Sequence, residues 1–130
     1  LGQSDTMPEC TYVGKERLLL ESDIISLHIP FIKEMGAYLG TDEFNYMKKG
    51  MVIINTARGG VVNENALLQA LDDGTVKMAA LDVYESEPTK DERIYTHNLI
   101  SLTPHIGAST IEAQNRIGQE IIEVILESLS

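Results

Sequence analysis

Short apolar runs alternate with segments of helical periodicity along the chain, and residues 51–60 show the pattern most clearly. They read Met-Val-Ile-Ile-Asn-Thr-Ala-Arg-Gly-Gly, so an aliphatic run stops at a cation and two glycines. Such a run, bounded by turn residues, predicts a strand buried on both faces. Beyond it, Asn63 can cap a helix that Gly74 closes. The apolar positions of that helix recur at helical spacing and are Ala66, Leu67, Ala70 and Leu71. The pattern therefore predicts a strand, a glycine turn and a helix, with Arg58 at the carboxyl end of the strand.

The rest of the chain repeats this alternation. Further strands are predicted at residues 24–30, 76–84 and 99–102, and further helices at residues 15–22, at 42–49 with Thr41 as the cap, and from a capping box of Ser109 and Glu112 to about residue 128. Residues 1–14, 33–41 and 85–98 are predicted as loops. Strands that alternate with helices imply right-handed crossovers and parallel pairing. The predicted fold is α/β, a partial doubly wound (Rossmann-like) parallel sheet with helices on both faces.

The composition narrows the possible partners. A net charge of −10, from 20 acidic and 10 basic residues, argues against nucleic acid and against anionic membranes. No apolar run approaches the ~20 residues of a membrane span. The one cysteine, Cys10, rules out an intrachain disulfide and fits a reducing cytoplasm. One cysteine and histidines without close spacing do not make a metal set either. We expect a cytoplasmic protein with no metal, nucleic-acid or membrane partner.

Polar side chains follow each of the four predicted strands. They are His28, Arg58, Asp82 with Glu87 just beyond, and His105. Each has a plain structural alternative, which is a buried core histidine, a surface arginine, a turn cap or a solvated acid. The carboxyl ends of parallel strands share one edge of a sheet, however, and ligands bind at that edge in open α/β folds. One cation, two carboxylates and two imidazoles on one rim predict a catalytic site.

This set of side chains suits proton transfer next to a carboxylate group. A carboxylate beside an imidazole orients the ring and stabilises its protonated form, which makes a general acid–base pair. Spacing alone does not choose between Glu85 and Glu87 for that carboxylate. A guanidinium grips a substrate carboxylate with two prongs and can polarise the neighbouring carbonyl. Interconversion of a hydroxyl and a carbonyl also moves a hydride, which no side chain carries, so a nicotinamide cofactor is expected at the same rim.

Four ordered segments resemble the D-isomer-specific 2-hydroxyacid dehydrogenases. They are residues 22–30, residues 47–62, residues 80–88 (Ala-Leu-Asp-Val-Tyr-Glu-Ser-Glu-Pro) and residues 102–110 (Leu-Thr-Pro-His-Ile-Gly-Ala-Ser-Thr). The similarity runs from about residue 15 to residue 130, and residues 105–114 are most similar to the D-3-phosphoglycerate dehydrogenases of that family. The resemblance implies interconversion of a D-2-hydroxy acid and its 2-keto acid with NAD. The expected pair is 3-phosphoglycerate and 3-phosphohydroxypyruvate.

The resemblance also implies a role for individual residues. Arg58 is expected to bind the substrate carboxylate, His105 to act as the acid–base, and Glu87, which directly precedes Pro88, to be its partner. Asp82 is expected to hold the nicotinamide carboxamide. The residues implied to bind the cofactor are Pro30, Thr56, Ala57, Arg58, Asp82, His105, Gly107 and Ala108. Family members are usually homo-oligomers, and the apolar stripe of residues 111–129 fits an oligomer contact, packing on the chain's own sheet or packing on the domain that this sequence lacks.

Two features depart from the family pattern. No Gly-x-Gly-x-x-Gly loop occurs, and that pyrophosphate loop, with the ribose-binding acid, belongs to the first half of such a domain. After Pro30, residues 31–35 (Phe-Ile-Lys-Glu-Met) replace the family's threonine-bearing loop. We therefore expect residues 1–130 to form the second half of a dinucleotide-binding domain, without the glycine-rich half and the substrate domain, and to be inactive in isolation. The choice between NAD and NADP stays open, with NAD favoured by the family.

Two other functions fit the same residues. The substrate can instead be glyoxylate, hydroxypyruvate or D-lactate, because the distal group of the substrate is read mostly by a domain that this sequence lacks. A non-enzymatic, dinucleotide-sensing corepressor is the second alternative, since such relatives can keep the equivalents of Arg58, Glu87 and His105.

Overall fold

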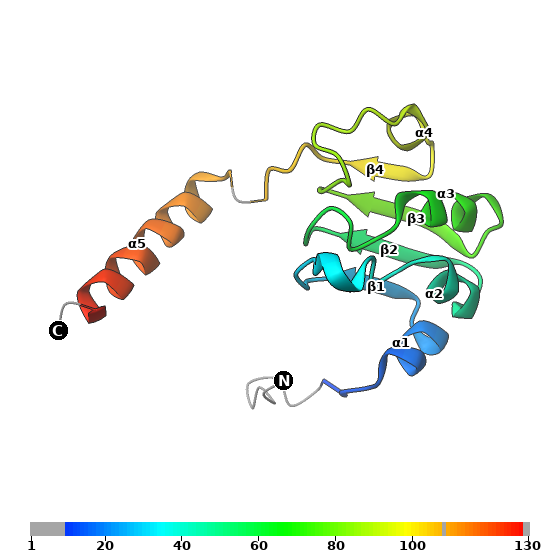
Figure 1. Ribbon diagram of the computed structural model, residues 1–130, viewed down its shortest axis with the longest axis horizontal. Coiled ribbons are helices and arrows are strands. Elements are labelled where there is room, and N and C mark those ends of the chain that lie inside the picture. The colour runs from blue at the N-terminus through cyan, green and yellow to red at the C-terminus, as the bar shows by residue number, and fades with distance from the viewer. Residues whose placement is uncertain (1–9, 108, 129–130) are drawn as a thin grey trace.

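The fold is built on a sheet of four parallel strands (Figure 1). In the computed structural model, which describes residues 10–107 and 109–128, the strands are β1 (Ile24–Leu27), β2 (Met51–Asn55), β3 (Val76–Leu81) and β4 (Ile100–Leu102). They lie in the order of the chain, β1-β2-β3-β4, and every neighbouring pair is parallel. The predicted α/β class and parallel sheet are confirmed. No helix within the two described ranges has the length and apolarity needed to cross a membrane.

Helices precede, connect and follow the strands. They are α1 (Lys15–Glu21), α2 (Thr41–Tyr46), α3 (Glu64–Asp72), α4 (Glu92–Tyr95) and α5 (Ile111–Ser128), with a 3-10 turn at Lys33–Met35. Four of these helices were predicted, whereas α4 lies inside the predicted loop at residues 85–98. Its four residues are too few to show a period, and it forms because Asp91 caps it by accepting the N–H of Arg93 at 3.0 Å while Ile94 enters the core.

The predicted caps of the two central helices have different outcomes. Asn63 caps α3 as predicted, because its Oδ1 accepts the N–H of Ala66 at 2.8 Å. The predicted cap of α2, Thr41, is instead the first residue of that helix. The cap position falls on Gly40, whose N–H donates to Glu43 Oε2 at 2.8 Å, so the acid in the first turn reaches back to the cap backbone as in one half of a capping box.

Within the described residues, the helices cover one face of the sheet. Two rows of side chains across β1, β2 and β3 are buried, namely Ile25–Ile53–Ala79 and Leu27–Asn55–Leu81. In the row before them, Ile24–Val52–Met78, the side chains of Ile24 and Met78 are 60% and 51% exposed. Helices on both faces were predicted, and for the described residues that part of the prediction is wrong. The strand order explains the result, because right-handed crossovers between neighbours that follow in one direction all pass over the same face.

The hydrophobic core lies between the covered face and the helices. Among its largest fully buried side chains are Leu39, Met51, Ile53, Leu67 and Ile94. Leu39 also forms an isolated parallel bridge with Val62. The connection between β1 and α2 is thereby tied to the segment that follows Arg58.

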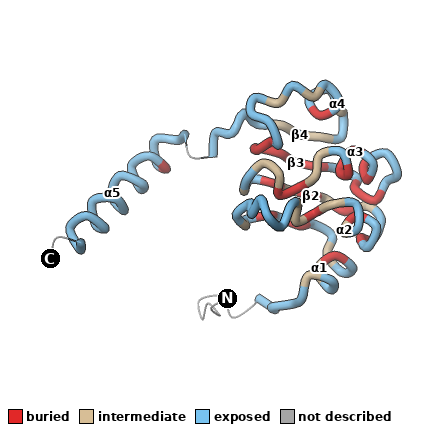
Figure 2. Tube along the Cα trace, viewed as in Figure 1, coloured by how far each residue is buried: buried red, intermediate tan, exposed pale blue. Residues whose placement is uncertain are grey.

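The last helix, α5, stands apart from this core. It contacts no other helix or strand of the described residues, and Figures 1 and 2 show it extending away from the sheet with most of its length exposed. Its cap is Thr110, whose Oγ1 accepts the N–H of Ala113 at 3.1 Å, and not the predicted Ser109. The exposed apolar side chains of α5 are Ile111, Ile117, Ile121, Ile122, Val124, Ile125 and Leu126. Packing of this stripe on the chain's own sheet, one of the three predicted alternatives, does not occur in the described structure.

Candidate active site

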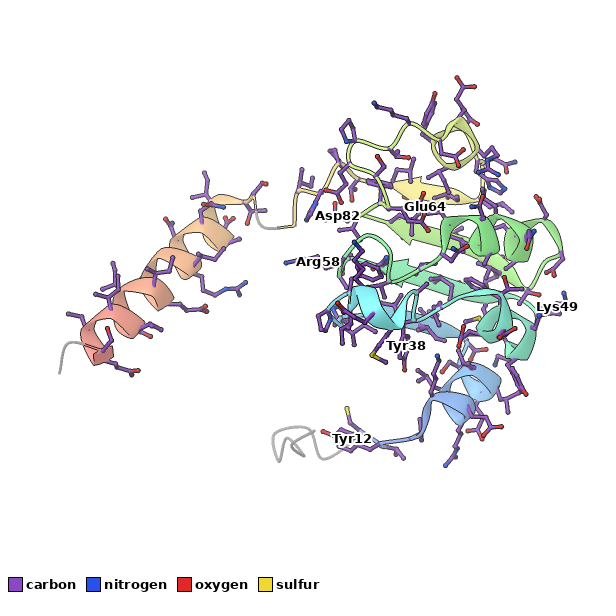
Figure 3. All side chains as sticks on the ribbon, viewed as in Figure 1. Tyr12, Tyr38, Lys49, Arg58, Glu64 and Asp82 are labelled. Carbon is purple, nitrogen blue, oxygen red and sulfur yellow. The ribbon has the colours of Figure 1, made fainter. Side chains whose placement is uncertain are left out.

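The four strands direct their carboxyl ends to one edge of the sheet, as parallel pairing requires. His28 follows β1 at this edge, and His105 follows β4. Figure 3 shows Arg58, which follows β2, and Asp82, which follows β3, on the same side of the molecule. The rim that the sequence predicts is therefore present, and its side chains come from segments far apart in the chain.

The turn that carries Arg58 is shaped by the last residue of β2. Asn55, which is 2% exposed, accepts the N–H of Ala57 at 3.1 Å and donates from Nδ2 to the carbonyl of Arg58 at 3.2 Å. Arg58 is exposed, and its Nη1 donates to the carbonyl of Ala57 at 2.7 Å. Across the described ranges, Arg58 has no carboxylate within ion-pair distance. A guanidinium held in this way keeps its donors for an external carboxylate.

Two glycines let the same turn lie directly against neighbouring segments. A Cβ on Gly59 would come 1.7 Å from the carbonyl oxygen of Tyr84, so the two backbones are in contact. Gly60 has a φ of 82°, and a Cβ there would meet the ring of Phe31 at 3.0 Å. Because only glycine tolerates these approaches, the turn of Arg58 is held between the β1–α2 connection and the segment that follows β3.

His105 and Glu87 form an imidazole–carboxylate pair. His105 Nδ1 lies 2.6 Å from Glu87 Oε2. The hydrogen bond with His105, and then the bond that the N–H of Tyr84 donates to Glu87 Oε1 at 3.2 Å, hold the pKa of Glu87 below its ordinary value. With Nδ1 engaged, Nε2 is the ring nitrogen that can face a substrate. The alternative partner, Glu85, lies elsewhere, since its Oε1 accepts the N–H of Glu64 at 2.8 Å.

Asp82 anchors the loop that carries His105. It is 7% exposed, and its carboxylate accepts hydrogen bonds from Thr103 Oγ1, from the N–H of Ile106 at 3.1 Å and from the N–H of Gly107 at 3.3 Å. Burial opposes ionisation of Asp82, but these hydrogen bonds and the neighbouring His105 outweigh it and keep the pKa of Asp82 below its ordinary value. His105 itself has a φ of 56°, a backbone conformation that few non-glycine residues adopt. The anchor is what holds this conformation.

Tyr84 joins the two halves of the imidazole–carboxylate pair. Its side chain is buried, and its hydroxyl lies 2.6 Å from the carbonyl oxygen of Thr103 and 3.1 Å from that of Leu81. Burial raises the pKa of Tyr84, so the hydroxyl remains a proton donor. Thr103 lies two residues before His105, while the backbone N–H of Tyr84 holds Glu87. One residue therefore contacts both segments that bring the pair together.

A hollow of about 380 Å³ lies at the carboxyl ends of β1 and β2. It is lined by His28, Ile29, Pro30, Thr56, Ala57 and Arg58, four of which were predicted to bind the cofactor. His28 is exposed, and its Nε2 lies 2.8 Å from Ser26 Oγ, so the alternative of a buried core histidine is wrong. The hollow combines the apolar surfaces of Pro30 and Ala57 with the hydroxyl of Thr56. This chemistry fits a flat ring with a polar edge, such as nicotinamide.

The other predicted site residues lie closer to β4. Glu87 and His105 line a second hollow, of about 450 Å³, whose walls also include Tyr95 and Leu102. Arg58 and His105 thus border two different hollows on one edge of the sheet. Gly107 packs on Asp82, since a Cβ on it would come 3.3 Å from Asp82 Oδ2, whereas Ala108 lies outside the described residues. In the described part of the chain, no three histidine, cysteine or acidic side chains are grouped as a metal site would need.

Sequence reasoning missed three residues that shape this site. Asn55 carried a usable signal, because it is the one polar residue at the end of an aliphatic run. Tyr84 and Thr103 carried none, because the hydrogen bond between them joins residues 19 apart in the chain. Such a contact follows from the pairing of β3 with β4 and not from any local pattern.

Comparison with known proteins gives the chain a family. Residues 2–107 match the family described as "D-isomer specific 2-hydroxyacid dehydrogenase, NAD binding domain". Over 118 residues, the chain is 44% identical to D-3-phosphoglycerate dehydrogenase 3, chloroplastic, of Arabidopsis thaliana. This match covers 90% of this chain and 20% of that protein. Over 121 residues it is 43% identical to hydroxypyruvate reductase of Thermotoga maritima, covering 91% of this chain and 40% of that protein.

Solved structures show the same relationship. The crystal structure of D-lactate dehydrogenase from Aquifex aeolicus, complexed with NAD and lactic acid, matches with a TM-score of 0.81 and 30% sequence identity. That match covers 99% of this chain and 44% of the other. The chain thus spans between 20% and 44% of the length of these relatives. It belongs to the D-isomer specific 2-hydroxyacid dehydrogenases, within their NAD-binding domain.

Proposed function

We propose that this chain is part of an NAD-dependent oxidoreductase that interconverts a D-2-hydroxy acid and its 2-keto acid. The observation that carries the proposal is the 2.6 Å contact between His105 Nδ1 and Glu87 Oε2, at the sheet edge where Arg58 also lies. A guanidinium and an imidazole–carboxylate pair on one rim supply substrate binding and proton transfer. NAD, when bound, takes up or returns the hydride that no side chain carries.

Each of the three side chains has one task in this proposal. Arg58 binds the carboxylate of the substrate and fixes the neighbouring carbon at the site. In oxidation, His105 Nε2 takes the proton of the 2-hydroxyl while C2 gives up its hydride, and the carbonyl forms. In reduction, Nε2 returns the proton to the carbonyl oxygen. Glu87 orients the ring through Nδ1 and stabilises its positive charge while the extra proton is held.

The cofactor contacts follow from the residues around the first hollow. Pro30, Thr56 and Ala57 line the side where nicotinamide is expected. Asp82 Oδ2 accepts one hydrogen bond, from the N–H of Gly107, and a carboxylate oxygen can accept two. Asp82 can therefore anchor the His105 loop and also accept a hydrogen bond from the nicotinamide carboxamide.

The proposed substrate pair is 3-phosphoglycerate and 3-phosphohydroxypyruvate. The 44% identity to the Arabidopsis thaliana dehydrogenase supports it, while the 43% identity to the Thermotoga maritima reductase makes hydroxypyruvate the second candidate. The test is oxidation of NADH by the full-length protein with 3-phosphohydroxypyruvate, hydroxypyruvate, glyoxylate and pyruvate. We expect the highest kcat/KM with the first. A higher value with another keto acid moves the assignment to that substrate. No turnover with any of the four contradicts the enzyme and favours the dinucleotide-sensing role.

We also propose that these residues supply the second half of a cofactor domain in a homo-oligomeric enzyme, and that they turn over nothing measurable alone. Two features support this. Among the described residues, β1 pairs only with β2, which leaves one of its edges open there, and one face of the sheet carries the exposed side chains Ile24 and Met78. The test compares NADH turnover by residues 1–130 with that of the full-length protein, together with the mass of the full-length protein by light scattering. Robust turnover by the short chain contradicts the first part, and a monomer contradicts the second.

A further inference from the structure

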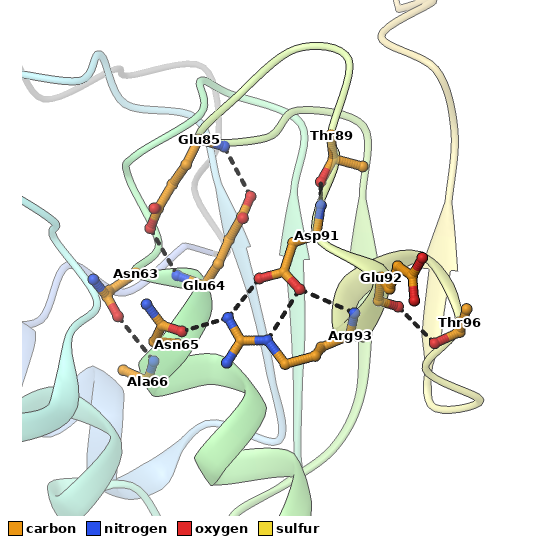
Figure 4. Close-up of polar contacts among 10 residues, drawn as sticks. All are labelled: Asn63, Glu64, Asn65, Ala66, Glu85, Thr89, Asp91, Glu92, Arg93 and Thr96. Carbon is orange, nitrogen blue, oxygen red and sulfur yellow. Dashed lines mark hydrogen bonds and ion pairs between the residues drawn. The ribbon is translucent and has the colours of Figure 1, made fainter.

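Glu64 and Glu85 hold each other's backbones (Figure 4). The N–H of Glu64 donates to Glu85 Oε1 at 2.8 Å, and the N–H of Glu85 donates to Glu64 Oε1 at 2.8 Å. Glu64 is the first residue of α3, and Glu85 follows β3, 21 positions later. Two reciprocal hydrogen bonds therefore close these segments into a ring, which we call the Glu64–Glu85 clasp.

The clasp lies where the two proposed catalytic segments meet. Glu85 is two residues before Glu87, and it lines a hollow of about 320 Å³ together with Gly59 and Gly60 of the Arg58 turn. The backbone of Gly59 is in contact with the carbonyl of the residue just before Glu85. The clasp consequently holds the Glu87 segment against the start of α3, which follows directly from the Arg58 turn.

Opposing interactions act on the pKa of Glu64 in the clasp. Burial raises the pKa of Glu64, the bond from the N–H of Glu85 lowers it, and the nearby carboxylates of Glu85 and Asp91 raise it again. The amino end of the nine-residue α3 favours negative charge in part compensation. Arg93 pairs with Asp91 at 2.6 Å and bonds Asn65 Oδ1 at 2.8 Å, so α4 is fastened to the same helix end (Figure 4). Because the carboxylates of Glu64 and Glu85 repel each other, the clasp adds little to the free energy of unfolding. Its two hydrogen bonds instead fix the distance between the start of α3 and the segment that follows β3.

We propose that the Glu64–Glu85 clasp is a positioning device that sets the place of Arg58 relative to the Glu87–His105 pair. The inference rests on the function proposed above. In a 2-keto acid, the carboxylate and the carbonyl are on adjacent carbons, so the guanidinium and the imidazole must stand at one separation to serve both. A misplacement of about 1 Å far from the chemistry can cost ~100-fold in rate. Neither Glu64 nor Glu85 touches substrate in this proposal, and each acts through the backbone that it holds.

The test uses four substitutions in the full-length protein. Glu64→Ala and Glu85→Ala each remove an acceptor oxygen, whereas Glu64→Gln and Glu85→Gln keep an amide oxygen that can accept the same N–H. The matched control is Glu92→Ala, which removes one exposed acid on α4 without touching the clasp. Three quantities are measured, namely kcat, KM for the keto acid, and hydrogen exchange at the amide of Tyr84, which is bonded to Glu87.

We expect both alanine variants to lower kcat/KM about tenfold, with KM raised and kcat reduced, because the carboxylate and the carbonyl can no longer be served together. Exchange at the amide of Tyr84 should speed up about tenfold, the equivalent of one lost hydrogen bond. The glutamine variants and Glu92→Ala should resemble the wild type. A role confined to stability would instead lower the folded fraction, and with it kcat, at an unchanged KM.

Two results would overturn the proposal. One is an alanine variant that keeps the kcat, the KM and the Tyr84 exchange of the wild type. The other is a glutamine variant that fails as badly as its alanine counterpart. If the wild-type protein turns over none of the four keto acids, the proposed function fails by itself. The clasp then stands on accelerated Tyr84 exchange in the alanine variants with rescue by glutamine, and falls if that exchange is unchanged.

Discussion

The Arg58 turn and the His105 loop lie at one edge of the sheet, yet they are held in different ways. The Arg58 turn is held from within, because Asn55, three positions earlier, bonds its backbone on both sides. The His105 loop is held from outside, by Asp82, which lies more than twenty positions earlier, and by Glu87, 18 positions earlier. The conformation of the Arg58 turn therefore depends on a short piece of chain, whereas the acid–base pair depends on the sheet that brings β3 beside β4.

This difference in support indicates which substitutions should disturb substrate binding by Arg58 and which should disturb proton transfer by His105. Substitutions in β3 or in the segment after it should displace His105 even though the residues next to His105 in the sequence are unchanged. The Arg58 turn should resist such changes except at Gly59, where it touches the backbone of Tyr84. Four predictions test this comparison, from the largest expected effect to the smallest.

The first prediction removes the imidazole of His105, the residue whose loop is held by Asp82 and Glu87. We expect His105→Ala to lower kcat about 100-fold or more in the full-length protein, because positioned proton transfer contributes that much. Steady-state kinetics with the preferred keto acid measure it. The control is His97→Ala, in the hollow between α3 and α4, which should leave kcat unchanged. Turnover that survives in His105→Ala would remove this residue from the mechanism.

A methyl group at the contact between the two segments should separate them. Gly59→Ala places a Cβ 1.7 Å from the carbonyl oxygen of Tyr84, so backbone must move, and we expect the free energy of unfolding to fall by about 3 kcal/mol. Chemical denaturation measures this loss. Gly118→Ala is the matched control, since a Cβ there meets nothing within 4 Å and alanine favours a helix. Equal stability of the two variants would show that the segments are not in contact.

Removal of the guanidinium should affect binding and leave the fold intact. We expect Arg58→Ala to raise KM for the keto acid about tenfold or more, since a hydrogen bond to a charged group contributes roughly 1.5–3 kcal/mol. The free energy of unfolding should change by less than about 0.5 kcal/mol, because the side chain is exposed and its turn is built by Asn55. An unchanged KM counts against the assigned role, and a large loss of stability counts against a turn held from within.

Acid should loosen the His105 loop before it affects the Arg58 turn. The pKa of Asp82 is lowered from 3.8 in the folded protein, so its ionised form stabilises the fold above about that pH, and the contribution is lost as the pH falls through the lower, folded value. We expect the wild type to lose unfolding free energy below about pH 4 and Asp82→Asn to show a flatter dependence. Denaturation at a series of acidic pH values measures both slopes. Parallel slopes would mean that Asp82 does not couple the loop to protonation.

Features that depend on neighbouring residues could be predicted from the sequence, whereas contacts between distant residues could not. β2, its glycine turn and α3 are local features, and the aliphatic run, the glycines and the cap at Asn63 predicted all three. Helix α4 was missed because four residues show no period. The choice between Glu85 and Glu87 was open on spacing alone, because both lie in one loop and only the approach of His105 separates them. Helices on both faces of the sheet were expected because the strands are almost wholly apolar. Which faces the helices cover depends instead on the order of the strands in the sheet.

The chain's pattern of apolar runs, glycines and polar strand ends was sufficient, by itself, to determine a parallel α/β sheet with Arg58, Asp82 and His105 after three successive strands. Periodicity and turn chemistry act within a few residues, so they are readable without coordinates. Only the tertiary structure decided that Glu87 meets His105, that Asp82 and Tyr84 hold the segments around that pair, and that Glu64 and Glu85 hold each other. These contacts join positions 18 to 25 apart, which only strand pairing brings within hydrogen-bond distance.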